Sequence, residues 1–193
     1  MTTLNLANLK NPSSGSNNIV LNADGTSTLT PSNIIKSGTA VASTSGTSID
    51  FTGLPSWVKR ITVMFSGVST NGTSPIQIQL GDSGGVETSG YLGSVEDMNP
   101  ANATGGAAIS AGFLTSISGN VTAAWIRHGV VRLHKIDGNT WIGDGAISAS
   151  NNNFFHLVAG SKTLSDTLTQ VRVTTVNGTD TFDAGTVNIL MEG

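Results

Sequence analysis

Hydrophobic and polar residues alternate with a period of two along most of this chain, and Gly, Asn and Ser residues separate the alternating stretches. This pattern is typical of β-strands that bury one face. No stretch keeps the three-four spacing of apolar residues that an amphipathic helix requires. About ten to twelve short strands of this kind predict an all-β fold, an antiparallel β-sandwich with a jelly-roll-like arrangement.

The strongest strand pattern covers residues 58–68, where Val58, Ile61, Val63 and Phe65 form the expected inward set. Residues 76–80 (IQIQL) predict a second strand with its glutamines facing outward. Further strands are expected at 4–6, 19–22, 26–29, 40–51, 109–117, 123–128, 130–136, 140–147, 154–158, 168–176 and 187–191. Residues 81–108 predict a long loop with one short strand near Tyr91.

Four Asp-Gly or Asn-Gly pairs predict tight turns between strands, because these residues adopt positive φ angles at low cost. The first, Asp24-Gly25, predicts a type I′ hairpin turn. The others are Asn71-Gly72, Asp137-Gly138 and Asn177-Gly178, of which the two Asn-Gly pairs predict hairpins.

Residues 1–36 differ from the rest of the chain. They contain no aromatic residue and few charges, and they include the turn-rich run NPSSGS. Such a segment cannot build a core of its own. We therefore predict an N-terminal arm over 1–36 that pairs with another surface, followed by a sandwich over 37–193.

Composition narrows the partners that the chain can bind. Charged residues make up only 11%, with 9 Lys and Arg against 12 Asp and Glu, and the sequence has no basic run, which argues against a nucleic-acid partner. No apolar run reaches the ~20 residues of a membrane helix, and MTTLNLANLK lacks the pattern of a signal peptide. The absence of cysteine excludes disulfides and thiolate chemistry.

The pentapeptide GDSGG at 81–85 matches the segment around the nucleophile of chymotrypsin-like proteases, with Ser83 in the nucleophile position. That mechanism needs a histidine base and an orienting aspartate, both of which precede the serine in that fold. Here all three histidines (His128, His134 and His156) follow Ser83. We therefore interpret the run as a polar turn and do not expect an enzyme.

Other candidate sites are weaker, and no metal or cofactor is expected. His128 and His134 are six residues apart and lack a third ligand nearby, which makes a poor metal site. The acids near 143–145 and 180–183 do not form a calcium loop. A carboxylate pair of the glycosidase type stays open, because any two acids can meet in the fold. Four aromatic residues are candidates either for stacking on a sugar or for the core: Trp57, Tyr91, Trp125 and Trp141.

Four Asn-x-Ser/Thr sites satisfy the glycosylation rule, and we interpret them as turn chemistry: Asn71, Asn102, Asn120 and Asn177.

Three stretches resemble a β-sandwich domain of tailed bacteriophages from cyanobacteria and other aquatic bacteria. They are FTGLPSWVKRITVMFSGVSTNGTSPIQIQLGDSGG at 51–85, SGYLGS at 89–94 and RVTTVNGTDTFDAGTVNILME at 172–192. Trp57 and the final Met-Glu-Gly are small departures from the pattern. The resemblance covers residues 37–193, and the segment before it looks like the lead-in that precedes this domain.

The resemblance implies a homotrimer on the virion, with no catalytic residues attached to it. Two roles fit such domains: cement on the outer capsid surface, bound to the major capsid protein, or the tip of a tail fibre or tailspike that binds host surface glycans. The short arm favours capsid decoration, and tail receptor binding is the alternative. On this view the capsid-docking residues are the apolar side chains of the arm: Leu4, Leu6, Leu9, Ile19 and Leu21.

Overall fold

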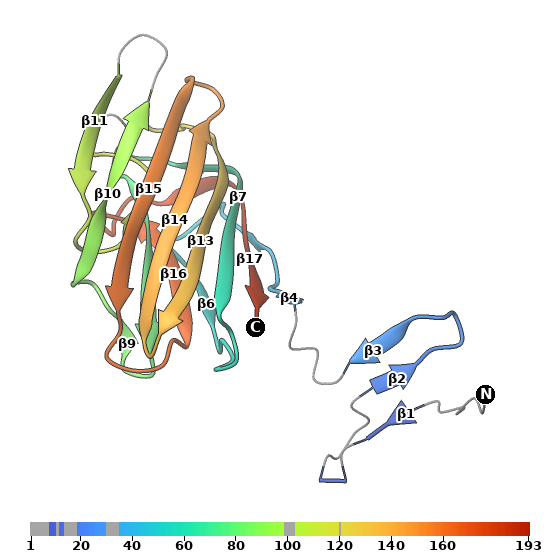
Figure 1. Ribbon diagram of the computed structural model, residues 1–193. Coiled ribbons are helices and arrows are strands. Elements are labelled where there is room, and N and C mark those ends of the chain that lie inside the picture. Colours follow the sequence, from blue (N-terminus) through green and yellow to red (C-terminus); the bar gives the residue numbers. More distant parts are fainter. Residues whose placement is uncertain (1–7, 11, 14–18, 30–34, 99–102, 120) are drawn as a thin grey trace.

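The computed structural model describes residues 8–10, 12–13, 19–29, 35–98, 103–119 and 121–193. Two antiparallel sheets pack face to face as a β-sandwich, and a small third sheet near the N-terminus lies apart from them (Figure 1). The described residues contain no helix. The all-β antiparallel sandwich predicted from the sequence is therefore confirmed.

The larger sheet has nine strands. Its hydrogen-bonded order is β11-β10-β15-β14-β13-β7-β17-β4, and β5 also pairs with β17. The strands are β4 (Ile35–Ser37), β5 (Val41–Ala42), β7 (Arg60–Thr70), β10 (Tyr91–Met98), β11 (Ala103–Ala108), β13 (Arg127–Asp137), β14 (Thr140–Ala149), β15 (Phe154–Thr163) and β17 (Phe182–Glu192). Since β4 belongs to this sheet, the predicted boundary between residues 36 and 37 falls inside a strand.

The smaller sheet has five strands in the order β12-β8-β16-β6, with β9 added beside β8. They are β6 (Ser48–Thr52), β8 (Ile76–Asp82), β9 (Gly85–Val86), β12 (Phe113–Leu114) and β16 (Gln170–Thr175). The third sheet consists of β1 (Asn8–Leu9), β2 (Ile19–Leu21) and β3 (Ser27–Leu29).

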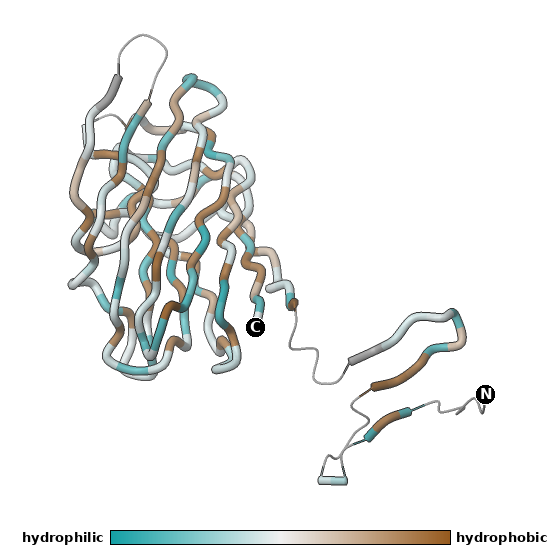
Figure 2. The backbone as a smooth tube through the Cα atoms, in the orientation of Figure 1, coloured by the Kyte–Doolittle hydropathy of each residue, from teal (hydrophilic) through white to brown (hydrophobic). Residues whose placement is uncertain are grey.

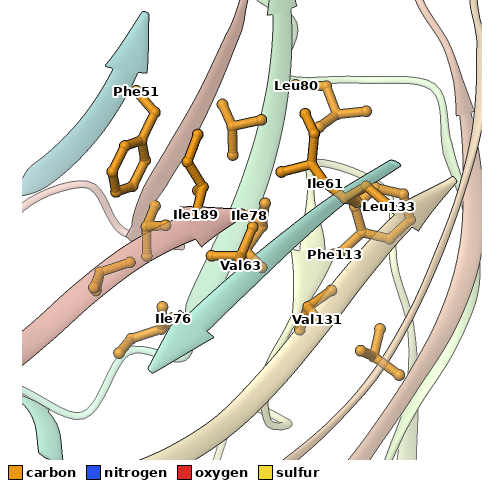
Figure 3. Close-up of a cluster of buried hydrophobic side chains, with 14 of the residues drawn as sticks. Phe51, Ile61, Val63, Ile76, Ile78, Leu80, Phe113, Val131, Leu133 and Ile189 are labelled. Atoms are coloured by element: carbon orange, nitrogen blue, oxygen red, sulfur yellow. The ribbon is translucent and has the colours of Figure 1, made fainter. Parts of the chain in front are cut away.

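The core lies between the two large sheets and is built almost entirely from aliphatic and aromatic side chains. Ile61 and Val63 of β7 face Ile78 and Leu80 of β8 across the sandwich, and Phe113 closes one side (Figure 3). The inward set predicted for 58–68 is confirmed, because all four of its members are buried.

Strand β8 departs from its predicted alternation. All seven of its residues are buried, including Gln77 and Gln79, which were expected to face solvent. The cause is the segment around Ala111, whose carbonyl accepts a 2.9 Å hydrogen bond from Gln79 Nε2. A polar residue on the outer face of a sheet can be buried when a loop covers it and satisfies its donor.

The two Asn-Gly pairs were predicted to form hairpins, and this prediction is wrong. The connection at 71–75 joins β7 of the larger sheet to β8 of the smaller one, and the connection at 176–181 joins β16 back to β17. Hydrogen bonds join these two connections. Asn71 N donates to Thr181 O at 3.0 Å, and Ser74 N donates to Asp180 Oδ2 at 2.9 Å. Their Asn and Asp side chains therefore bind across the sandwich rim instead of closing a hairpin.

The first turn has a different geometry from the one predicted. Gly25 has a φ of +85°, but Asp24 does not adopt a positive φ, so the turn is not type I′. Gly25 N donates to Asn22 O at 3.1 Å, and Asn22 N donates to Thr26 O at 2.9 Å. A type I turn followed by a left-handed glycine fits this pattern.

Several strand predictions also change. The loop expected over 81–108 contains the whole of β9, β10 and β11, and the strand expected over 109–117 shrinks to β12. The strand expected at 123–128 is wrong over 123–126, whereas residues 127–128 join the strand expected at 130–136 in one strand, β13, which continues through Gly129 at a φ of +146°. The strand expected at 4–6 lies outside the described residues.

Candidate docking surface

The small N-terminal sheet carries three of the five predicted docking residues on one face. Leu9 lies directly opposite Ile19, and Ile19 and Leu21 alternate on β2. Leu9 is 49% exposed and Leu21 is 51% exposed, while Ile19 is half-buried. Figure 2 shows hydrophobic stretches on the small N-terminal sheet, which lies apart from the sandwich. Leu4 and Leu6 lie outside the described residues.

Two features make this sheet incomplete by itself. Its strands have only two or three residues each, and such a sheet needs packing on one face to be stable in water. Its outer strands, β1 and β3, each pair on one side only. The sheet thus offers both an apolar face and free strand edges, which are the two features that a sheet-pairing partner uses.

The arm joins the sandwich through β4. This strand pairs with β17, where Glu192 lies opposite Ile35 and Leu190 lies opposite Ser37. Gly38 N then donates to Ile189 O at 2.8 Å, so the chain is fixed to the larger sheet as soon as it leaves the arm.

The GDSGG run is a tight hairpin turn between β8 and β9, as predicted from its polar residues. Asp82 Oδ1 accepts from Gly84 N at 2.7 Å, and Asp82 Oδ2 accepts from Ser165 Oγ at 2.6 Å. The Ser165 bond chiefly holds the pKa of Asp82 below its ordinary value. Ser83 is exposed at the tip of the turn, and its neighbouring aspartate orients a loop serine instead of a histidine.

The three histidines have separate environments. His128 Nδ1 accepts from Gly67 N at 3.2 Å, and His134 Nε2 lies 3.6 Å from Asp144 Oδ1. His128 and His134 thus contact different partners on β13. Nowhere in the described part of the chain do three His, Asp or Glu side chains gather as metal ligands.

Three of the four aromatic candidates belong to the interior. Trp141, Tyr91 and Trp125 are all buried, whereas Trp57 packs partly buried against the core. The Tyr91 hydroxyl accepts from Leu80 N at 2.7 Å, and burial raises the pKa of this phenol. Tyr91 and Trp141 belong to the core between the two sheets, and Trp125 packs on Phe154 and His156, so the structure supports a packing role for these rings.

A buried polar cluster was not found from the sequence. His156 Nδ1 lies 2.6 Å from Asp97 Oδ1, and each side chain is 1% exposed. Arg127 is fully buried nearby, where burial lowers its pKa to about 10 while the carboxylates of Asp183 and Asp97 act in the opposite direction. Ile117 N also donates to Asp97 at 3.3 Å, which fixes the loop before β13 to the sheet. The cluster is shielded from solvent, and the Asp97–His156 contact joins the side chains of the neighbouring strands β10 and β15.

No protein-family model, curated protein or solved structure matches the chain. The described residues include no helix long and apolar enough to cross a membrane.

Proposed function

We propose that this chain is a structural protein of a phage virion, which decorates the outer capsid surface and docks there through its N-terminal arm. One observation carries the proposal: Leu9, Ile19 and Leu21 share the face of a small sheet that has no core of its own. The sequence resemblance supplies the virion context, and the stable sandwich supplies the body that the arm would attach.

The docking energy follows from burial of that face. A leucine side chain contributes roughly 1.5–3 kcal/mol when it moves from water into an apolar contact. Pairing of β1 or β3 with a strand of the major capsid protein adds backbone hydrogen bonds. In a trimer, three arms bind together, so modest binding by each arm gives a long residence time.

The outer face of the larger sheet supports the trimer within this proposal. Met64, Val130, Ala146 and Leu157 lie side by side on β7, β13, β14 and β15. They form an apolar row of half-buried or exposed side chains across four strands. The Arg132–Asp144 ion pair and Glu96 flank this row, so a second copy of the chain that packs there would meet an apolar centre with charged side chains beside it.

The decisive experiment measures how strongly three variants of the chain bind to capsids that lack this protein. Deletion of residues 1–32 should abolish capsid binding, and L9D/L21D should weaken it at least tenfold. The control L92D changes a leucine that is 69% exposed on the sandwich and should bind normally. Full occupancy by the deletion variant would place docking on the sandwich. If no form binds capsids but the full chain binds host cells, receptor binding at the tail replaces capsid decoration.

A further inference from the structure

Positive charge gathers at one end of the sandwich, although the sequence has no basic run. A cleft of about 430 Å³ lies where β4, β17, β7 and β13 meet, and Lys59, Arg60 and Lys135 line it together with His134. Three of the nine Lys and Arg residues of the chain therefore line this cleft.

Strand register explains why residues so distant in sequence meet here. Ile35, Glu192, Arg60 and His134 form one row across four neighbouring strands. At the next step, Lys59 N donates to Glu192 O and Lys135 N donates to Lys59 O, each at 2.8 Å. The two lysines are thus fixed beside each other by main-chain bonds.

The local carboxylates do not neutralise these cations. Glu192 is one of twelve acidic residues in the chain and the only acidic side chain in the cleft lining among the described residues. It pairs with Arg60, whose hydrogen bond lowers the pKa of Glu192, so the carboxylate is already engaged. Lys59 and Lys135 form no ion pair with any described residue, so the side chains that line the cleft keep a net positive charge.

We infer that this basic end is a second docking surface, which binds a carboxylate-rich surface of the protein on which the arm docks. The inference rests on the proposed function and deepens it. The arm enters the sandwich through β4, whose Ile35 lines the cleft, and Figure 1 shows β4 and the C-terminus together at the side from which the arm extends. A docked arm therefore brings this end toward the same partner. Complementary charge at the contact fixes orientation and speeds association.

A matched pair of variants tests the surface. K59Q/K135Q removes two positive charges from the cleft, and S118E/N152E adds two negative charges at exposed positions outside the cleft lining. On capsids lacking the protein, K59Q/K135Q should bind at least tenfold more weakly at 50 mM salt and lose less affinity than the parent chain as salt rises. The control should keep the parent affinity and salt dependence. Unchanged binding by K59Q/K135Q would overturn the inference.

A second measurement separates this inference from the capsid proposal. NMR titration of the full chain with poly-L-glutamate should shift the amide signals around Lys59 and Lys135, and K59Q/K135Q should lose those shifts. If the shifts appear but no capsid binds, the proposed function fails and the anion-binding surface stands. Shifts spread over the whole surface, or tighter binding of a short DNA duplex at the same residues, would overturn the acidic-protein partner.

Discussion

Gly185 shows how much the sandwich depends on single backbone positions. It adopts a φ of +91°, and a Cβ atom there would lie 2.3 Å from Gly67 O on the neighbouring strand. Gly178 has a φ of +67° with open space around it. We expect G178A to cost about 1–2 kcal/mol from backbone strain alone, and G185A to cost on the order of 3 kcal/mol or more because the strand must also move. Urea unfolding of both variants measures the difference, and equal losses would contradict it.

The buried Asp97–His156 pair should matter far more than the ion pairs on the surface. D97N removes the charge that faces His156 and Arg127 inside the protein, and breaking a buried pair in this way costs about 3–5 kcal/mol. D144N breaks the exposed contacts with Arg132 and His134 and should cost under about 1 kcal/mol. Chemical denaturation at pH 7 tests both. A D97N loss as small as that of D144N would show that the pair is not structural.

At the scale of elements, the β8–β9 hairpin is held by an acid-sensitive network. Ser165 Oγ donates to both Asp82 and Glu87, and Lys162 pairs with Glu87. The pKa of Asp82 is lowered chiefly by Ser165. Burial raises the pKa of Glu87, but Lys162 and Ser165 outweigh it, so the net shift is also downward.

Carboxylates with lowered folded-state pKa values stabilise the protein fully above their unfolded values, near pH 4, and lose that contribution as the pH falls through the folded values. The parent Tm should therefore fall steeply below about pH 4. D82N/E87Q should have a lower Tm at pH 7 but a flatter decline below pH 4. Parallel curves for the two proteins in a calorimetric pH series would rule out this network as the cause.

Most of the strands follow from local pattern, whereas the connections between the sheets do not. The alternation around Ile61 and Val63 predicts a half-buried strand because every second side chain meets the core. Asn71-Gly72 and Asn177-Gly178 have hairpin chemistry, yet each leads into the opposite sheet. That outcome depends on mutual bonds such as Ser74 to Asp180, which join residues 106 positions apart. The Asp97–His156 pair and the basic cleft could not be predicted from the sequence for the same reason, because only the register between strands brings their residues together.

The arm and the sandwich should behave as separate units of the whole molecule. Among the described residues of the arm, those of β4, which begins at Ile35, are the ones that pair with the larger sheet. Deletion of residues 1–32 therefore leaves every strand of the two large sheets intact, and its Tm should lie within a few degrees of the parent value. Differential scanning calorimetry tests this directly. A fall of more than about 10 °C, equivalent to several kcal/mol at this size, would show that the arm is part of the folding unit.

The oligomeric state of the protein should be set by the sandwich and should not depend on the arm. If the outer face of the larger sheet joins three copies, light scattering of the full chain should give about three times 19.7 kDa, and deletion of the arm should leave that stoichiometry unchanged.

A146E places a charge in the middle of the row formed by Met64, Val130 and Leu157. Because an unpaired carboxylate in an apolar contact is costly, A146E should yield monomers with a nearly unchanged Tm. The control T163E adds the same charge to an exposed position at the end of β15 and should remain trimeric. A parent chain that is monomeric at micromolar concentration would refute the trimer, and an A146E trimer would move the subunit contact to another face.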